Sequence, residues 1–501
     1  MNTKKPAITT LGELKASGWE CISVKDEIRK NLIKKIKQGE PLFEGVLGYE
    51  KTVFPQIQHA ILSQHDIILL GLRGQAKTRM LRSFIHLLDE YMPIVAGSEI
   101  NDNPLNPVSK FAKNLIEING DHTPIDWIHK SHRYGEKLAT PDTTVADLIG
   151  DIDPIKAATN KLNLADEQTI NFGLIPRTNR GIFVINELPD LQPRIQVALL
   201  NIMQERDIQI RGFNVRIPLD ISIAFSANPE DYTNRGNIIT PLKDRIDAQI
   251  ITHYPKELKI GIEITKQEAR EIRKDTANIY VSNIYREIIE RATFEARESE
   301  YIDQKSGVST RMSITAMEQI VSSAERRAII NNESSTVLRI ADIFHMVPAL
   351  TGKLELVYEG EQEGTVSVAK HIIGKAISNT FKNYFPDPQS RNGEDKTKYG
   401  VITDWFSKGN EVNLSDILST VKYNKVLDSV DGLRDLVKDF ITLESDEHLY
   451  SMMDFALEAL HQNSMLSKED KDDSSKYSDM VGSMISSFGR LKDQDYEDFD
   501  I

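Results

Sequence analysis

The segment from Asp66 to Leu88 constrains this chain more than any other stretch. The apolar run Ile67-Ile-Leu-Leu70 is followed by Gly71-Leu-Arg-Gly-Gln-Ala-Lys77-Thr78, and then by apolar residues at helical spacing. A strand, a glycine-bearing loop ending in Lys-Thr, and a helix form the order that a phosphate-binding P-loop requires. Because the backbone N–H groups of such a loop attract an anion, the sequence predicts a phosphate site here.

The loop residues have distinct expected roles. Lys77 would reach the terminal phosphates of a nucleotide, and the Thr78 hydroxyl would ligate Mg²⁺. Ala76 departs from the pattern, because a second glycine normally precedes the lysine. The alternative interpretation is a chance strand–turn–helix junction. The predicted nucleotide contacts in this region are Gly71, Gly74, Gln75, Ala76, Lys77, Thr78 and Arg79.

Two further apolar runs end in polar residues. Ile182-Phe-Val-Ile185 precedes Asn186 and Glu187, and Ile221-Ser-Ile-Ala-Phe225 leads to Asn228. The first run is where an acidic pair would hold the Mg²⁺ hydration shell and polarise the attacking water. Asn186 replaces the first acid and contributes no charge, so we expect weaker metal binding or slow turnover. Asn228 could hydrogen-bond the γ-phosphate or the water.

The order of these segments predicts an α/β fold. Apolar strands alternate with helical patterns, which indicates a parallel sheet with helices on both faces and ligands at the carboxyl ends of its strands. Residues 93–145, rich in Pro, Asn, Asp and His, predict an irregular insertion, and 207–217 predict a β-hairpin. The predicted parts are an N-terminal arm and helix (1–45), an ATPase core (46–255), an all-helical lid (256–365), a helical region (366–466) and an acidic, flexible tail (467–501).

Composition narrows the possible functions. The 501 residues include 61 basic and 75 acidic ones, and the net charge of −14 argues against nonspecific binding to nucleic acid or to anionic membranes. The single cysteine, the absence of a signal-peptide pattern and the absence of an apolar run of ~20 residues predict a cytoplasmic protein. His122, His129 and His132 match no strong metal-ligand spacing, so loop histidines are expected, with a metal site as the alternative.

Taken together, the motifs resemble those of the ATPase subunit of magnesium chelatase and its MoxR-type relatives within the AAA+ family. The resemblance covers roughly residues 40–350. It is carried by Gly71–Thr78, Asp151-Ile-Asp-Pro-Ile155, Phe172–Glu187, Ser226–Glu230 and Leu242–Arg245.

The resemblance implies ATP and Mg²⁺ as cofactors and a role for each matching residue. Glu187 would orient water, Asn228 would be sensor 1, and Thr78 and Asn186 would lie at the metal. Arg245 would be the arginine finger that reaches the nucleotide of a neighbouring subunit, and Arg311 would be sensor 2 at the start of a lid helix.

The resemblance also implies an ATP-hydrolysing ring, commonly a hexamer, that remodels a protein partner of the von Willebrand factor A type. Two alternatives stay open: the motor subunit of a magnesium chelatase, and a nucleotide-gated scaffold with little hydrolysis. A DNA helicase or loader is disfavoured by the net charge and by the lack of an aromatic and basic cluster.

Overall fold

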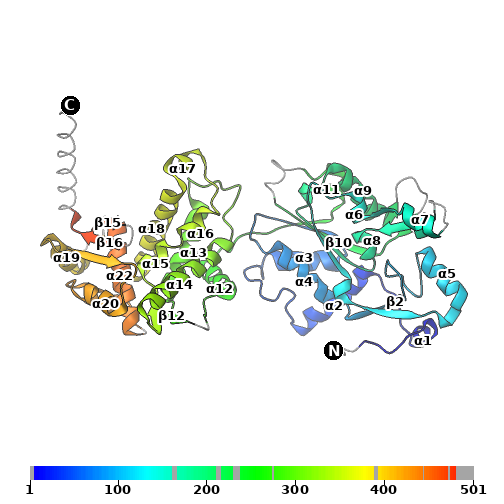
Figure 1. Cartoon of the computed structure of the whole chain (residues 1–501), viewed down its shortest axis with the longest axis horizontal. Coiled ribbons are helices and arrows are strands. Elements are labelled where there is room, and N and C mark those ends of the chain that lie inside the picture. Colours follow the sequence, from blue (N-terminus) through cyan, green and yellow to red (C-terminus); the bar gives the residue numbers. More distant parts are fainter. Residues whose placement is uncertain are drawn as a thin grey trace. The chain divides into compact units, whose positions relative to one another are not determined.

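The chain forms two compact units, residues 1–254 and 255–501 (Figure 1). The computed structural model describes residues 5–160, 166–209, 216–228, 237–273, 276–388, 393–443, 445–471 and 474–480. Each unit is described by itself below. Among the described helices, none is both long and apolar enough to span a bilayer.

A five-stranded parallel sheet forms the centre of the first unit. Its strand order is β11-β1-β10-β7-β4, and every neighbouring pair runs parallel. The strands are β11 (Ala248–Ile251), β1 (Ile67–Leu70), β10 (Ile221–Ala227), β7 (Gly181–Asn186) and β4 (Tyr134–Leu138). The predicted parallel sheet is confirmed.

Both faces of the sheet are buried, because successive side chains point to opposite sides. Ile67 and Leu69 pack on one side with the helices α2 (Val24–Gln38), α3 (Val53–Leu62) and α4 (Lys77–Ser83). Ile68 packs on the other side with α6 (Val145–Leu148), α8 (Leu174–Arg177), α9 (Pro193–Glu205) and α11 (Thr240–Arg245) (Figure 1). Each fully buried aliphatic side chain contributes roughly 1.5–3 kcal/mol, which is why continuous apolar runs mark these strands.

The prediction that residues 93–145 form an irregular insertion is wrong. This segment contains most of β2 (Tyr91–Val95), its antiparallel partner β3 (Ile125–His129), α5 (Lys110–Asn119) and the edge strand β4. Smaller elements complete the unit: α1 (Leu11–Ala16), the pair β5 (Gly150–Ile152) and β6 (Ile170–Phe172), and α7 (Pro154–Asn160). The polar residues misled the prediction because an edge strand need not be apolar.

The predicted hairpin has paired arms. Strands β8 (Asp207–Gln209) and β9 (Arg216–Pro218) are antiparallel, with Ile208 opposite Ile217. The predicted tip, residues 210–215, lies outside the described residues.

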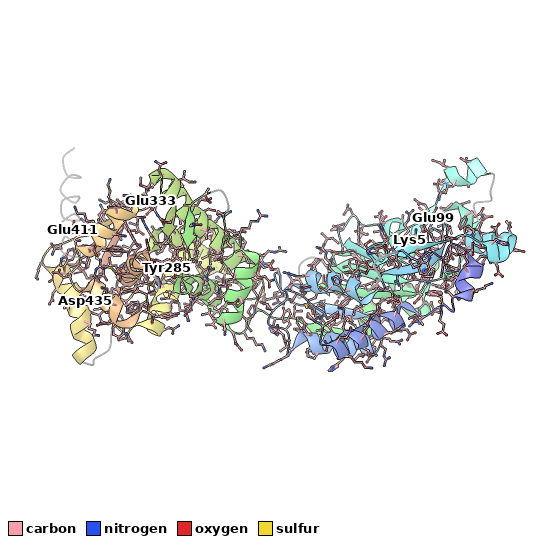
Figure 2. All side chains as sticks on the ribbon, turned by 90° about the horizontal axis from the view of Figure 1, so that it is seen from below. Lys5, Glu99, Tyr285, Glu333, Glu411 and Asp435 are labelled. Carbon is pink, nitrogen blue, oxygen red and sulfur yellow. The ribbon has the colours of Figure 1, made fainter. Side chains whose placement is uncertain are left out.

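The second unit is mainly helical and has one continuous hydrophobic core, which runs from Ile284 to Tyr477. Tyr285 lies in its interior, whereas Glu411 and Asp435 are exposed (Figure 2). The helices are α12 (Leu258–Glu268), α13 (Asn283–Glu298), α14 (Arg311–Asn331), α15 (Ile340–Phe344), α16 (Val347–Thr351), α17 (Tyr358–Glu363), α18 (Thr365–Tyr384), α19 (Gly393–Ser407), α20 (Thr420–Asp428), α21 (Leu433–Phe440) and α22 (Asp446–Gln462), with a short pair β12 (Asn278–Tyr280) and β13 (Ser335–Val337). Residues 366–466 therefore share a core with the predicted lid.

The start of the predicted flexible tail, at Ser467, is too early. Strands β15 (Ser467–Lys471) and β16 (Ser474–Ser478) pair with each other, and β16 also pairs with β14 (Val412–Ser415). Buried Glu458 on α22 holds this sheet in place, because it accepts a hydrogen bond from the Tyr477 hydroxyl at 2.6 Å and pairs with Lys468 at 3.0 Å. Residues 481–501 lie outside the described residues.

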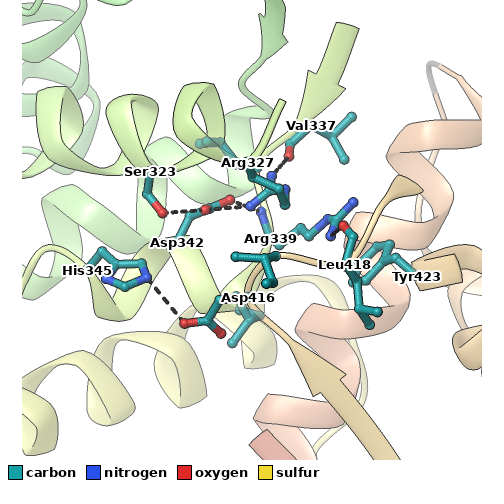
Figure 3. A network of polar contacts seen from close by, with 12 residues as sticks. Ser323, Arg327, Val337, Arg339, Asp342, His345, Asp416, Leu418 and Tyr423 are labelled. Atoms are coloured by element: carbon teal, nitrogen blue, oxygen red, sulfur yellow. Dashed lines mark hydrogen bonds and ion pairs between the residues drawn. The ribbon is translucent and has the colours of Figure 1, made fainter. Parts of the chain in front are cut away.

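A buried polar network links the two predicted helical regions of this unit (Figure 3). Arg327 on α14 pairs with Asp342 on α15 at 2.6 Å, and both side chains are at most 2% exposed. Asp342 also accepts hydrogen bonds from Ser323 Oγ at 2.7 Å and from the Arg339 backbone at 2.9 Å. The Arg339 guanidinium lies 3.9 Å from the Tyr423 ring centroid, so the network reaches α20.

Candidate nucleotide-binding site

The carboxyl ends of three neighbouring strands meet at one edge of the sheet. Leu70 of β1 pairs in register with Ala227 of β10, and Phe225 pairs with Ile185 of β7. The Gly71 backbone continues this pairing by donating a hydrogen bond to the Ala227 carbonyl at 3.2 Å. The loop after β1, the pair Asn186–Glu187 and Asn228 therefore lie at the same edge, as their sequence positions predicted.

The loop between β1 and α4 wraps around the Lys77 ammonium group. Lys77 is only 7% exposed, and its Nζ donates to the Leu72 carbonyl at 3.0 Å and to the Gly71 carbonyl. Gly74 and Ala76 have φ angles of 74° and 57°, which turn the backbone through the left-handed region. This curvature gives the loop the concave shape that a phosphate group needs.

Side chains outside the motif hold the loop in place. The Tyr49 hydroxyl donates to the Gln75 carbonyl at 3.0 Å, and Thr252 Oγ1 donates to Gln75 Oε1 at 2.6 Å. The Tyr254 hydroxyl donates to the Arg73 carbonyl at 2.9 Å. A Cβ atom on Gly71 would collide with Thr252 Oγ1 and Gln75 Oε1, so only glycine fits there. Motif spacing did not identify Thr252 or Tyr254, because they come from a distant segment.

Oxygen atoms converge at the start of α4. Thr78 Oγ1 lies 3.5 Å from Asn186 Oδ1, which also accepts a hydrogen bond from Ser226 Oγ at 2.8 Å. Hydroxyl and amide oxygens are hard donors that suit Mg²⁺, so Thr78 and Asn186 fit the predicted metal role in their chemistry. Mg²⁺ held by Thr78 and Asn186 would neutralise negative charge on the phosphates of a bound nucleotide.

Glu187 leaves the strand in a strained conformation. Its φ of 55° is left-handed, a conformation that costs a residue with a side chain roughly 1–2 kcal/mol. Its backbone N–H donates to Ser226 Oγ at 3.4 Å, and its Oε2 atom is buried. Strain of this kind is common where a side chain must be aimed at a reacting group.

The predicted arginines lie at three different places. Arg79 is exposed in the first turn of α4. Arg245 ends α11, pairs with the neighbouring Asp244 and is 44% exposed. Arg311 begins α14 in the second unit and is exposed. The first unit thus contains every predicted site residue except Arg311, whose role at the nucleotide stays a prediction.

Of the three histidines predicted to lie in loops, His129 ends β3 and has two local partners. His129 Nε2 lies 2.8 Å from Glu90 Oε1, and its Nδ1 lies 2.8 Å from Ser131 Oγ. His122 and His132 lie in exposed short helical turns. Within the parts of the chain that the structure describes, no group of three or more His, Cys, Asp or Glu side chains could hold a metal ion.

Replacing Ala76 with glycine is expected to raise the free energy of unfolding of the first unit by about 0.5–1 kcal/mol. Glycine removes the left-handed strain of ~1–2 kcal/mol, and its extra unfolded-state entropy offsets part of that gain. Chemical denaturation would measure the change. The control is Ala60→Gly in α3, which should lower stability by about 1 kcal/mol or more. Equal losses in both variants would contradict the strain at Ala76.

Comparisons with known proteins agree with this geometry. The family described as the Sigma-54 interaction domain matches residues 163–251. The chain is 25% identical over 243 residues to the magnesium-chelatase 38 kDa subunit of Cereibacter sphaeroides, covering 46% of this chain and 65% of that protein. It is 24% identical over 197 residues to the chaperone MoxR1 of Mycobacterium tuberculosis, covering 36% and 52%. The chain thus spans about half to two thirds of the length of these curated relatives.

One solved structure is a complex between subunits BchI and BchD of magnesium chelatase. Its matching chain has 17% sequence identity and a TM-score of 0.33, with 64% of this chain and 98% of that chain covered. A TM-score this low adds nothing to the assignment, which rests on the sequence relatives and on the parallel sheet with its loop. The sequence relatives and the parallel sheet with its loop support an AAA+ protein of the magnesium chelatase and MoxR type, with the nucleotide-binding fold in the first unit.

Proposed function

We propose that this protein binds and hydrolyses ATP with Mg²⁺ in the cytoplasm, and that it acts as a ring which remodels a protein partner. The observation that carries the proposal is the meeting of the Lys77 loop, Asn186–Glu187 and Asn228 at one sheet edge. Phosphoryl transfer to water needs positioning and charge neutralisation more than covalent chemistry, and these residue types supply both.

Each residue has a defined task in this proposal. The Lys77 ammonium exchanges its loop carbonyls for the phosphate oxygens of ATP, and Glu187 orients the attacking water. Asn228, half-buried at the end of β10, hydrogen-bonds the γ-phosphate or that water. Arg245 is exposed on α11, which suits a residue that completes the site of a neighbouring subunit. Arg311 keeps the predicted role of sensor 2.

Lys77→Ala tests nucleotide binding and hydrolysis together. Removing the ammonium should weaken ATP affinity by at least ~10-fold and reduce phosphate release to background, because charged hydrogen bonds to phosphate contribute about 1.5–3 kcal/mol each. Calorimetry and a phosphate-release assay with Mg²⁺ give the two values. The control is Lys30→Ala, which changes an exposed lysine on α2. Unchanged ATP binding in Lys77→Ala would overturn the proposed site.

The ring and its partner form the finer part of the proposal. Light scattering with ATP and Mg²⁺ should give a mass of about six chains, and a monomer under these conditions contradicts the ring. The chain is similar to the chaperone MoxR1, and we propose a protein of the von Willebrand factor A type as its partner. Co-purification with such a protein in the presence of ATP would test that partner directly.

The motor subunit of a metal chelatase is the second candidate. It is favoured by the similarity to the magnesium-chelatase 38 kDa subunit. A third candidate, a nucleotide-gated scaffold, would bind ATP tightly and release almost no phosphate. Comparing affinity with turnover in the wild-type protein separates the scaffold from both motors, and porphyrin metallation with chelatase subunits separates the motors from each other.

A further inference from the structure

A carboxylate lies next to Asn186, on the neighbouring strand. Asn186 Nδ2 donates a hydrogen bond to Glu136 Oε1 at 2.8 Å, and Glu136 belongs to β4, which pairs with β7. The register places Leu138 opposite Asn186 and Glu136 opposite Val184, so the long glutamate side chain reaches forward along the sheet. An acid that motif reasoning expects at position 186 is therefore present one strand away.

The same carboxylate is bound from the other side by α4. Arg82 Nε donates to Glu136 Oε2 at 2.8 Å, and Arg82 Nη2 donates to Glu136 Oε1 at 2.9 Å. Glu136 raises the pKa of Arg82 through these hydrogen bonds. Thr78 and Arg82 are four residues apart on α4 and so lie on one helix face. Thr78 on that face contacts Asn186 directly. Arg82 on the same face binds Glu136, which in turn accepts a hydrogen bond from Asn186.

These contacts fix which way the Asn186 amide points. A carboxylate only accepts hydrogen bonds, so the NH₂ group of Asn186 must face Glu136. The amide oxygen then faces Thr78 Oγ1 and Ser226 Oγ, the two hydroxyls beside the predicted metal position. Asn186 is 4% exposed, so water offers little competition for these bonds.

An aspartate at position 186 would not fit this arrangement. Its carboxylate would lie within hydrogen-bond distance of the Glu136 carboxylate without a proton between them, and two such like charges disfavour each other's ionisation. Asn186 and Glu136 therefore form a matched pair, in which the amide occupies β7 and the acid occupies β4. The pair explains why an asparagine is tolerated at this position.

We propose that Glu136 is a positioning residue for bound Mg²⁺–ATP, which holds the Asn186 amide oxygen toward Thr78 and takes the place of an acid at the end of β7. The inference rests on the proposed nucleotide site. It extends that site to β4, whose residues no motif assigns. Side chains that orient a metal ligand typically change metal affinity by 10–100-fold when they are replaced.

A four-protein cycle tests the pair: wild type, Glu136→Gln, Asn186→Asp and the exchanged double variant. Each single variant should weaken Mg²⁺–ATP affinity by about 10-fold while changing affinity for Mg²⁺-free ATP by less than about 3-fold. Asn186→Asp should also lower the melting temperature without nucleotide, because it places two carboxylates together. In the double variant, the introduced glutamine amide on β4 can donate to the introduced aspartate on β7, so both the melting temperature and the Mg²⁺–ATP affinity should recover.

The control is Glu117→Gln, an exposed glutamate on α5, which should match wild type in every measurement. If wild type binds Mg²⁺–ATP and Glu136→Gln binds it equally well, the positioning role is wrong while the proposed function stands. The matched pair is also wrong if Asn186→Asp melts at the wild-type temperature. It is equally wrong if the double variant has no higher melting temperature or Mg²⁺–ATP affinity than the single variants. If wild type binds no Mg²⁺–ATP, the proposed function itself fails.

Discussion

Replacing Glu187 with glutamine is expected to slow ATP hydrolysis by about 10²–10³-fold while changing ATP affinity by less than about 3-fold. Proton acceptance and orientation of the attacking water by a carboxylate contribute 10²–10⁴-fold in rate, and an amide of the same size cannot accept that proton. The phosphate-binding loop is untouched, so ground-state binding should persist. Single-turnover phosphate release and equilibrium nucleotide binding give the two values.

Glu187→Gln should change the side-chain carboxylate without disturbing the backbone around it. Its left-handed backbone and its hydrogen bond to Ser226 involve main-chain atoms, which glutamine retains. The control is Glu205→Gln, which changes an exposed glutamate at the end of α9. Hydrolysis at the wild-type rate in Glu187→Gln would remove Glu187 from the role of water-orienting carboxylate. A parallel loss of ATP affinity would instead indicate a structural role.

The three strand ends were predictable from sequence because each of them follows a buried apolar run. In β1, β7 and β10 both faces are covered, so hydrophobic residues are continuous until the polar residue at the edge. Such a boundary is visible without knowing which strands are neighbours. The prediction therefore found Lys77, Asn186 and Asn228 at the edge where the structure places them.

Strand β4 was missed for the opposite reason. Tyr134-Gly-Glu-Lys-Leu138 is an edge strand whose first four residues are half-buried, so it has neither an apolar run nor a clear alternation. Its role follows from its pairing with β7, a long-range contact that local patterns do not encode. Since Glu136 lies on this strand, the partner of Asn186 could not be identified before the sheet order was known.

In the second unit, the charged sequence from Ser467 onward forms a strand pair that the sequence analysis did not predict. The Lys468 side chain is 5% exposed, and its ammonium group pairs with Glu458 at 3.0 Å and lies 4.4 Å from the centroid of the Phe344 ring. Lysine can bury its methylene chain when the charge has a partner. A charged composition predicts solvent-exposed residues, so the sequence analysis placed the start of the flexible tail too early.

The shared core of the second unit leads to a strong expected effect at Arg327. Replacing Arg327 with methionine should lower the free energy of unfolding of this unit by about 3–5 kcal/mol, because the buried Asp342 carboxylate loses its partner. Burial by itself would lower the pKa of Arg327, but the charge and hydrogen bond of Asp342 outweigh burial and raise that pKa above its usual value. The guanidinium therefore stays charged, and the pair exists as ions. Chemical denaturation followed by circular dichroism would measure the loss.

The neighbouring Arg326 offers a matched control, because it is exposed on the same helix. Arg326→Met should change stability by less than about 0.5 kcal/mol. The Arg327→Met loss should appear as one transition that includes residues 366–466, since Asp342 holds the Arg339 backbone and the Arg339 side chain reaches Leu418 at 2.7 Å. Hydrogen exchange that rises in α14 and α15 but not in α20 would show that the two regions unfold separately. Exchange that rises in all three would show that residues 311–344 and 420–428 unfold as one cooperative unit.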